Sequence, residues 1–558
     1  MIDSSFFMAD FETTTDENDC RVWAWGVCNI LTEETHIGTR IDDFLEWCFR
    51  ESCVLYFHNL IFDSAFIIDY IMKNGYEYTP ENTPQNKQFT VVISAMGKMY
   101  GMKMCRRGVT VELRDSLKKI PLSVANTAKA FNLPISKLEI DYHEYRAPDH
   151  ELTPHEELYL CHDILIMARA LRHQLEEGLE KLTVGADALD YFKTSLGGAF
   201  TNLFPVLDPE TDALIRKSYR GGFTYADPRY QGRKLGVGQV FDVNSLYPYV
   251  MKTRLLPVGM PVYHDGYQET SDEFPLAIYC MNFTAKLKSN HIPCIQIKNN
   301  PAFMPTAYLD SVDEVTQLWV TSVDWELWND HYDIEEYGCA ATFLCRAEYD
   351  IFTEYVDYWG HIKETSTGGM RTIAKLMLNS LYGKFATNPD VSGKYPVLEN
   401  DCVKLVAGPE ETRNPVHIPM GAFITAYARE ITIRAAQENF DIFAYADTDS
   451  LHLITDTIPD NLDVHPTRLG AWKHEDSFTE ALFIRAKQYL EKIDGHFSVH
   501  IAGMPKHVAK TLTFDTACDG ATFGGKLVPV RVPGGMILRE TTFTIKYPSL
   551  ENHYGTQV

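Results

Sequence analysis

The segment FAYADTDSLHL, residues 443–453, places two acidic residues inside an apolar run, and few folds accommodate that pattern. If the segment is extended, side chains alternate between faces, so Asp447 and Asp449 share one face with Cα atoms about 6.6 Å apart. Two like charges at that spacing need a cation nearby. A solvated hairpin turn is the alternative, because Asp and Thr are common turn residues. An EF-hand calcium loop does not fit, since Leu451 and His452 occupy positions that need an oxygen ligand and a glycine.

A second acidic pair repeats this arrangement near the amino terminus. Asp10 and Glu12 in FMADFETTT are one residue apart in a strand-like context, and Asp242 lies in another strand-like run, KLGVGQVFDVNSLYPYVM. Converging carboxylates are what two-metal phosphoryl transfer requires, with ions about 3.5 to 4 Å apart. Oxygen ligands favour Mg²⁺ or Mn²⁺ over zinc.

Two further acids, Asp163 and Asp63, can be explained without a functional role when each is taken alone. The sequence from Thr153 predicts a capped helix, with Pro154 at its first position. On that helix Tyr159 and Asp163 are four residues apart and share a face, although a core tyrosine and a solvated acid would also explain them. Asp63 stands among Phe and Ile residues in YFHNLIFDSAFI, as an acid does beside a cation or at a turn.

The segment MRTIAKLMLNSLYGKF predicts a helix with one polar stripe. Lys375, Asn379 and Tyr382 fall at i, i+4 and i+7, and Arg371 extends the stripe by one turn. The stripe offers cations for a triphosphate and a ring for a base or sugar. A solvated helical face explains the charges equally well, but it does not explain Tyr382 followed by the helix-ending Gly383.

Composition sets the broad class of the protein. A chain of 558 residues exceeds one core and predicts two to four domains. The 12 cysteines are scattered, the amino terminus lacks a signal-peptide pattern, and no apolar run approaches the ~18 residues of a membrane span, so we expect a cytosolic protein with reduced thiols. The net charge of -25 disfavours a nucleic-acid partner, yet a basic groove can coexist with an acidic outer surface.

The order of elements along the chain separates several units. Strands are expected over residues 5–30, a first domain boundary over 183–200, a mixed insertion over 254–350 and helices over 351–386. Strands and turns follow to about 415, and then a helix and a strand pair that contains the opening segment. The carboxy-terminal part is expected to be a small mixed unit.

In this order the motifs resemble one family. DFETTT, HNLIFD and YLCHD are similar to the three exonuclease motifs of family B DNA polymerases. YRGGF, DVNSLYP, KLMLNSLYGKF, TAYAR, YADTDS and KQY are similar to their polymerase motifs, and two insertions resemble the terminal protein regions of the protein-primed subgroup found in small phages of the phi-twenty-nine type. The tail YPSLENHYGTQV extends beyond the end of such relatives, and the segment after KQY is shorter.

The resemblance implies a multidomain α/β and α+β fold, in which an RNase H-like 3'-5' exonuclease domain joins a right-hand polymerase. The expected ranges are exonuclease 1–182, first palm segment 183–253, terminal protein region 1 254–350, fingers 351–386, terminal protein region 2 387–418, second palm segment 419–502, and thumb with tail 503–558.

The resemblance also implies roles for single residues. Asp242, Asp449 and the Val243 carbonyl would bind two metal ions, with Asp447 in support. Asp10, Glu12, Asp63 and Asp163 would bind two more at the exonuclease site, where Tyr159 orients the attacking water and Lys137 assists. The expected nucleotide-binding residues are Tyr247, Lys363, Arg371, Lys375, Asn379 and Tyr382. The expected DNA-binding residues are Asn59, Phe62, Ser116, Leu117, Tyr219, Arg220, Gly221, Gly222, Thr425, Arg429, Lys487 and Tyr489.

The function implied is a DNA-directed DNA polymerase that starts on a terminal protein, displaces the non-template strand and proofreads. Expected partners are template and primer DNA, dNTPs, the terminal protein and a single-stranded DNA-binding protein, with Mg²⁺ (or Mn²⁺) as cofactor and no membrane. We expect a monomer in the cytoplasm of an infected bacterium. The alternatives are a family B polymerase that uses nucleic-acid primers only, a non-catalytic DNA-binding or scaffold protein, and an acidic calcium-binding protein.

Overall fold

The computed structural model describes residues 5–142, 144–296 and 308–547, so most of the predicted C-terminal tail lies outside the described residues. An eight-stranded mixed sheet forms the N-terminal domain, in the order β3-β2-β1-β4-β8-β7-β6-β5. Its strands are β1 Phe6–Thr13, β2 Val22–Asn29, β3 Thr35–Gly38, β4 Cys53–Phe57, β5 Glu77–Tyr78, β6 Gln88–Ile93, β7 Met99–Arg106 and β8 Val109–Asp115.

Helices cover this sheet and position its acids. They are α1 Ile41–Cys48, α2 Leu60–Lys73, α3 Val124–Ala130 and α4 Pro154–Glu176. Helix α4 begins as predicted: the Thr153 hydroxyl accepts the Glu156 amide, and the Glu156 carboxylate accepts the Thr153 amide, with Pro154 at the first position. The apolar face of α4 packs on β1 and β2, so Ile164, Met167 and Leu171 are buried.

A five-stranded antiparallel sheet, β20-β11-β19-β18-β9, lies at the centre of the chain. Its strands are β9 Thr224–Ala226, β11 Gly238–Val243, β18 Phe443–Asp447, β19 Ser450–Leu453 and β20 Trp472–Phe478. Helices α8 Leu246–Thr253 and α13 Ile418–Glu438 pack beside it, and α13 is buried along most of its length. The region 183–200, expected as the first domain boundary, is largely helix α5 Val184–Leu196, which packs against helix α11 Gly368–Ser380 through a continuous apolar core.

The remaining elements flank the central sheet. The first insertion contains β12 Leu256–Asp265, β13 Leu276–Leu287, β14 Ser311–Thr321, α9 Ser322–His331 and β15 Tyr332–Glu348. The predicted fingers are α10 Thr353–Thr365, α11 and α12 Tyr382–Phe385, and short helices α6 Ala199–Leu203 and α7 Pro209–Arg216 lie before β9. A separate four-stranded sheet contains β10 Lys234–Leu235, β21 Glu480–Arg485, β22 Gln488–Ile493 and β23 His496–Ile501, followed by α14 Lys506–Ala509.

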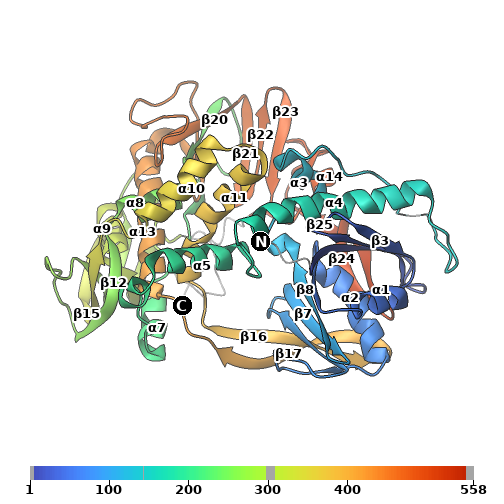
Figure 1. Cartoon of the computed structure of the whole chain (residues 1–558). Helices are drawn as coiled ribbons and strands as arrows, with labels where there is room; N and C mark the ends of the chain where they lie inside the picture. The colour runs from blue at the N-terminus through green and yellow to red at the C-terminus, as the bar shows by residue number, and fades with distance from the viewer. Residues whose placement is uncertain (1–4, 143, 297–307, 548–558) are drawn as a thin grey trace.

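Two long hairpins reach back to the N-terminal domain (Figure 1). They are β16 Asp390–Glu399 with β17 Cys402–Thr412, and β24 Thr522–Val532 with β25 Gly535–Thr544. Val403 of one hairpin and Val532, Met536 and Ile537 of the other are buried in the N-terminal core. The chain therefore forms a closed circuit that runs from the N-terminal domain through α5 to the central sheet and back along each hairpin.

Both hairpin tips meet on helix α2, through a set of contacts that we call the α2 clasp. Asp69 Oδ1 accepts the Gly534 amide at 3.1 Å, and Asp69 Oδ2 is 3.1 Å from Lys73 Nζ. Lys73 Nζ also lies 2.9 Å from Asp401 Oδ1 at the tip of the β16–β17 hairpin. At Gly534 and Gly535 a Cβ atom would collide with Cys20 and Phe66, so glycine allows the close approach.

In the part of the chain that the structure describes, no helix is long and apolar enough to cross a membrane.

Candidate functional site

The acids of the opening segment lie at a hairpin turn and not within one strand. Strand β18 ends at Asp447, β19 begins at Ser450, and Thr448 between them has φ 65°. The Asp449 amide donates to the Asp447 carbonyl at 2.8 Å, and the Thr448 amide donates to the Phe223 carbonyl at 2.6 Å. The left-handed backbone at Thr448 reverses the chain, so the single-strand interpretation is wrong and the hairpin-turn alternative is correct.

Asp242 completes this cluster, which we call the central acid group: Asp242, Asp447 and Asp449. Asp242 lies near the end of β11 opposite Ser450, and the Val243 amide donates to the Asp449 carbonyl at 2.8 Å. Burial, together with the charge of Asp449, raises the pKa of Asp242 to about 7, and burial raises the pKa of Asp449. The two carboxylates therefore share a region that favours added positive charge.

Asp447 differs from the other two because protein groups already bind its carboxylate. Lys487 Nζ lies 2.8 Å from Asp447 Oδ1, and the Thr224 hydroxyl donates to the same oxygen at 3.0 Å. Thr224 follows the YRGGF motif and was not predicted. These contacts agree with a supporting role for Asp447, with Asp242 and Asp449 as the candidate metal ligands.

The predicted polar stripe faces the central acid group. Arg371, Lys375 and Asn379 are exposed on α11, and the charge of Lys375 lowers the pKa values of Asp242 and Asp449 against the effect of burial. Helix α11 ends at Ser380, and the short helix α12 includes Gly383, so Gly383 does not end the helical segment as predicted.

Two other groups complete the nucleotide-binding candidates. Lys363 Nζ donates to the Ser245 hydroxyl at 2.9 Å, and Arg371 donates to the Lys363 carbonyl. Burial, with the charges of Lys375 and Arg371, lowers the pKa of Lys363. The rings of Tyr247 and Tyr382 stack with centroids 3.8 Å apart and an angle of 11° between their planes. Cations and two aromatic faces thus surround the same acids.

The second cluster, the N-terminal acid group, consists of Asp10, Glu12, Asp63 and Asp163. Asp10 and Glu12 share a face of β1, Asp63 is in the first turn of α2, and Asp163 is on α4. Glu12, Asp63 and Asp163 are 7%, 4% and 4% exposed. Burial and the neighbouring carboxylate Asp163 raise the pKa of Asp10 to about 7, and burial with similar repulsion raises the pKa values of Glu12 and Asp63.

Lys137 provides a cation for this group, as the sequence predicts. It forms an ion pair with Asp163, and Lys137 Nζ lies 2.9 Å from the Tyr159 hydroxyl. The Tyr142 hydroxyl lies 2.6 Å from the same Tyr159 oxygen. Tyr142 was missed, although an aromatic residue five positions after Lys137, in DYHEY, was a usable signal. Together these contacts fix the orientation of the Tyr159 hydroxyl.

The donor set at both groups fits a hard divalent ion. Asp163 Oδ1 is buried and has no hydrogen-bond partner in the described part of the chain, which is a costly state for a carboxylate oxygen. Within that same part, no three acidic, histidine or cysteine side chains form a ready-made metal cage. Mg²⁺ rarely uses such a cage, because it binds one or two carboxylates and takes its other ligands from water and substrate phosphates.

The residues expected to contact single-stranded DNA near the N-terminal acid group include both surface and buried side chains. Asn59 is exposed and Phe62 and Leu117 are half-buried near the N-terminal acid group, with the Asp115 carboxylate accepting the Asn59 and Leu117 amides at 3.0 Å each. Ser116 is fully buried and its hydroxyl donates to the Phe57 carbonyl. A direct DNA contact by the Ser116 side chain does not fit this structure, whereas a supporting role does.

Three other predicted DNA contacts are also inside the protein. Arg429 is 3% exposed, pairs with Asp324 and donates to the Arg220 and Gly221 carbonyls. The Arg220 guanidinium donates to the Trp319 carbonyl at 3.1 Å, and the Thr425 hydroxyl donates within its own helix. These side chains stabilise the linker and the first insertion, because burial leaves their donors engaged with the protein.

The glycines of the linker motif also differ from each other. A Cβ on Gly222 would lie 2.8 Å from the Thr448 side chain, so Gly222 makes room for the central hairpin and not for a template strand. Gly221 is exposed with open space around it, and Tyr219 is half-buried. Only Gly221 and Tyr219 are therefore available at the surface for the predicted contact.

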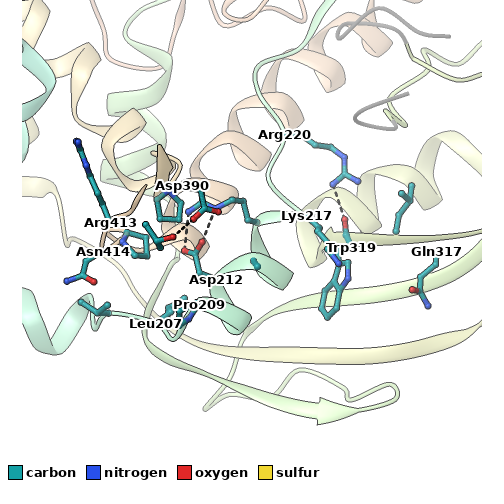
Figure 2. Close-up of a pocket in the computed structure, with 17 residues that line it drawn as sticks. Leu207, Pro209, Asp212, Lys217, Arg220, Gln317, Trp319, Asp390, Arg413 and Asn414 are labelled. Carbon is teal, nitrogen blue, oxygen red and sulfur yellow. Dashed lines mark hydrogen bonds and ion pairs between the residues drawn. The ribbon is translucent and has the colours of Figure 1, made fainter. Parts of the chain in front are cut away.

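A cavity of about 850 Å³ lies apart from both acid groups, between α7, β14 and the base of the β16–β17 hairpin. Figure 2 shows Asp212 and the Arg220 contact with Trp319 in its wall. Asp212 forms an ion pair with Arg216. None of the predicted metal ligands lines it.

Comparison with known proteins identifies the family. A profile described as "DNA polymerase type B, organellar and viral" matches residues 49–157 and 143–465. The DNA polymerase of Bacillus phage PZA is 42% identical over 97% of this chain and 99% of its own length, and that of Streptococcus phage Cp-1 is 31% identical over 97% and 98%.

The solved structures agree with these matches. Phi29 DNA polymerase complexed with primer-template DNA and incoming nucleotide substrates superposes with a TM-score of 0.93 at 41% identity, covering 97% of this chain and 100% of that one. The fold is accordingly the predicted one, an exonuclease domain joined to palm, fingers and thumb. The chain belongs to the phi29-type DNA polymerases of the viral type B family.

Proposed function

We propose that this protein is a DNA-directed DNA polymerase that starts synthesis on a terminal protein, copies a linear viral genome with strand displacement, and proofreads with a 3'-5' exonuclease. The observation that supports it is the pair of separate acid groups, one facing the cationic stripe of α11 and one buried around Lys137 and Tyr159. The phage relatives are named DNA polymerases, and solved phi29 complexes contain primer-template or single-stranded DNA.

At the polymerase site, Asp242 and Asp449 would hold Mg²⁺ or Mn²⁺, with the Val243 carbonyl as a further ligand. When bound, the two ions would stabilise charge on the attacking and leaving oxygens. Lys375, with Lys363 and Arg371, binds the triphosphate. Tyr247 and Tyr382 are already stacked, so the incoming sugar and base meet aromatic faces, and Tyr247 excludes a ribose 2'-hydroxyl.

At the exonuclease site, Asp10, Glu12, Asp63 and Asp163 would hold two ions of the same kind. Tyr159 orients the attacking water through a hydroxyl that Lys137 and Tyr142 fix in place. Asn59, Phe62 and Leu117 hold the single-stranded 3' end, and ring stacking on Phe62 suits any base. The partners are template and primer DNA, dNTPs, the terminal protein and a single-stranded DNA-binding protein, in the host cytoplasm.

The residue ranges predicted for the domains stay part of this proposal. The second palm range, 419–502, contains strands of two sheets, the central one and the one that includes β22. The two insertions would contact the terminal protein and enclose DNA, and the β24–β25 hairpin would act as the thumb.

Paired active-site variants test the proposal. D449A should abolish primer extension and leave exonuclease activity within about twofold, whereas D10A/E12A should do the reverse, by on the order of 1,000-fold in each case. Loss of both activities in each variant, or of neither, would contradict the assignment. Transfer of a labelled nucleotide to a terminal protein separates protein priming from nucleic-acid priming.

A further inference from the structure

A buried histidine–glutamate hydrogen bond joins two sheets behind the central hairpin. His452 Nδ1 on β19 lies 2.6 Å from Glu491 Oε1 on β22, and the two side chains are 2% and 3% exposed. Strand β19 belongs to the central five-stranded sheet, whereas β22 belongs to the four-stranded sheet. Burying an imidazole and a carboxyl group carries a desolvation cost that one contact does not always repay, so stability alone is a weak reason for this pair.

The pair continues as a polar chain to the catalytic turn. His452 Nε2 lies 3.5 Å from the Ser450 hydroxyl oxygen. That oxygen accepts the Asp447 amide at 3.3 Å and lies 3.4 Å from the Asp447 carbonyl oxygen, an alternative acceptor for its proton. When Nδ1 carries the proton that it donates to Glu491, Nε2 is an acceptor directed toward Ser450. Glu491 is thus connected to the backbone at the start of the turn that carries the metal-ligand candidates.

The same strand is attached to the hairpin at its other end. The Lys487 amide donates to the Tyr445 hydroxyl at 2.9 Å, and Lys487 Nζ binds Asp447. Between the two ends, the ring of Tyr489 lies against Tyr445 and His452, with centroids 4.8 and 5.1 Å away. Lys487 and Tyr489 belong to the KQY motif and are expected DNA-binding residues, and the family resemblance implies that they hold the primer end.

Two attachments fix a strand where one would let it pivot. Glu491 lies within β22, and Lys487 lies in the turn just before it, with φ 61°. Tyr489 lies between these two attachments, so its position relative to the catalytic turn depends on both. Strand β22 must therefore stay in register with the turn if a primer 3' hydroxyl is to lie beside Asp449.

We propose that His452 and Glu491 are positioning residues for the primer terminus, which hold Lys487 and Tyr489 in register with the turn that carries Asp447 and Asp449. This inference rests on the proposed function, because it assumes that the KQY segment contacts the primer. It assigns no chemical step to either residue.

Single-nucleotide extension by E491Q tests the inference. Glutamine keeps the size of the side chain and removes its charge. We expect the KM for primer-template to rise about 10-fold, kcat to stay within about twofold, and degradation of single-stranded DNA to be unchanged. With a paired primer the ratio of excision to extension should therefore increase. E491D, which restores the charge, should recover part of the loss.

E480Q is the matched control. Glu480 lies in the same sheet and pairs with Lys234 and Lys492, but its side chain is 32% exposed and remote from His452. We expect its KM to equal that of the wild type. H452Q should reproduce the effect of E491Q, and the double variant should add little, since both changes remove one interaction.

Two outcomes would overturn the inference. One is an E491Q protein that melts like the wild type and has an unchanged KM for primer-template. The other is an E491Q protein whose extension and single-strand degradation fall by the same factor, as a loss of folded protein would produce. A wild-type protein that fails to extend any primer would instead contradict the proposed function.

Discussion

The two acid groups place similar carboxylates in different surroundings. Asp242 and Asp449 are half-buried at the rim of a hairpin, and the nearby cations of α11 are exposed on a separate element. Three of the N-terminal acids, Glu12, Asp63 and Asp163, are almost completely buried and Asp10 is half-buried, and Lys137 is already paired with Asp163. In the central group Lys487 pairs with Asp447. Asp242 and Asp449 therefore depend on cations that can also bind an incoming triphosphate, whereas the N-terminal group has Lys137 on one of its candidate metal ligands. The difference predicts that the polymerase and exonuclease activities respond unequally to loss of a lysine and that the two sites contribute unequally to the pH dependence of stability. It also predicts that loosening a hairpin tip affects neither site directly.

Loss of Lys375 gives the largest expected effect. In K375A, insertion efficiency for dNTPs should fall about 100-fold, because one cation that faces both the acids and the triphosphate is removed. Single-turnover insertion over a range of dNTP concentrations measures this. The exonuclease should be unaffected. An insertion efficiency within threefold of the wild type would show that the stripe is merely a solvated face.

Loss of Lys137 should have a smaller effect, confined to the other site. K137A should lower exonuclease activity about 10- to 100-fold, since Lys137 supports Asp163 and Tyr159. The charge of Lys137 lowers the pKa values of Asp10 and Glu12. Its removal should move the acidic limb of the exonuclease pH profile to higher pH, with the polymerase profile as the control. An unshifted limb would contradict this electrostatic role.

The raised acid pKa values predict a pH-dependent stability in chelated buffer. Asp10 and Asp242 have folded pKa values of about 7, above the ordinary value of 3.8. The folded state therefore binds more protons between about pH 4 and pH 7, and stability falls as pH rises through that window. We expect the Tm with EDTA to be a few degrees higher at pH 6 than at pH 8.

Magnesium and single variants separate the two sites in this measurement. Mg²⁺ should remove most of the difference at pH 8 by binding the charged form. D10N should remove more of it than D242N, because Asp10 lies in the more crowded group of acids. If D10N and D242N reduced the Tm difference equally, the crowding of acids around Asp10 would not distinguish the two sites.

The smallest expected effect concerns the α2 clasp, whose contacts include none of the candidate catalytic residues. D401N removes the partly exposed pair with Lys73, a contact of about 1 kcal/mol or less. The length synthesised in one binding event, measured with a DNA trap, should fall about twofold, and single-nucleotide addition should not change. E399Q is the control, because Glu399 pairs with Lys404 of its own hairpin. If E399Q shortened the product of one binding event as much as D401N, the Asp401–Lys73 contact at the hairpin tip would have no special role.

The sequence identified the acidic residues of both groups but did not predict how the backbone arranges them. The stripe on α11 and the capping box of α4 follow local rules of helix periodicity and hydrogen bonding, and the structure confirms both. The turn at Thr448 did not follow from a strand pattern, since alternation cannot show where a chain reverses. The family resemblance, which the comparisons confirm, provided the domain order.

The residues that sequence reasoning misplaced depend on long-range packing. Arg220, Arg429 and Ser116 belong to motifs associated with DNA contact, yet each is buried by elements far away in the sequence. Arg429 pairs with Asp324, more than 100 positions earlier. Tyr142 and Thr224 gain their roles in the same way, by approaching Tyr159 and Asp447 across different elements. No local pattern contains such information.

The α2 clasp also has a topological consequence. Two hairpins return to the N-terminal domain, so a DNA strand enclosed by this circuit is threaded through it. A linear molecule can enter by its end, but a covalently closed circle can enter only when the hairpin tips separate from α2. Besides the clasp contacts, apolar side chains of both hairpins are buried in the N-terminal core, so the tips separate only when this contact unfolds locally. Capture of a closed circle should then be limited by how often the clasp opens, and capture of a linear end should not.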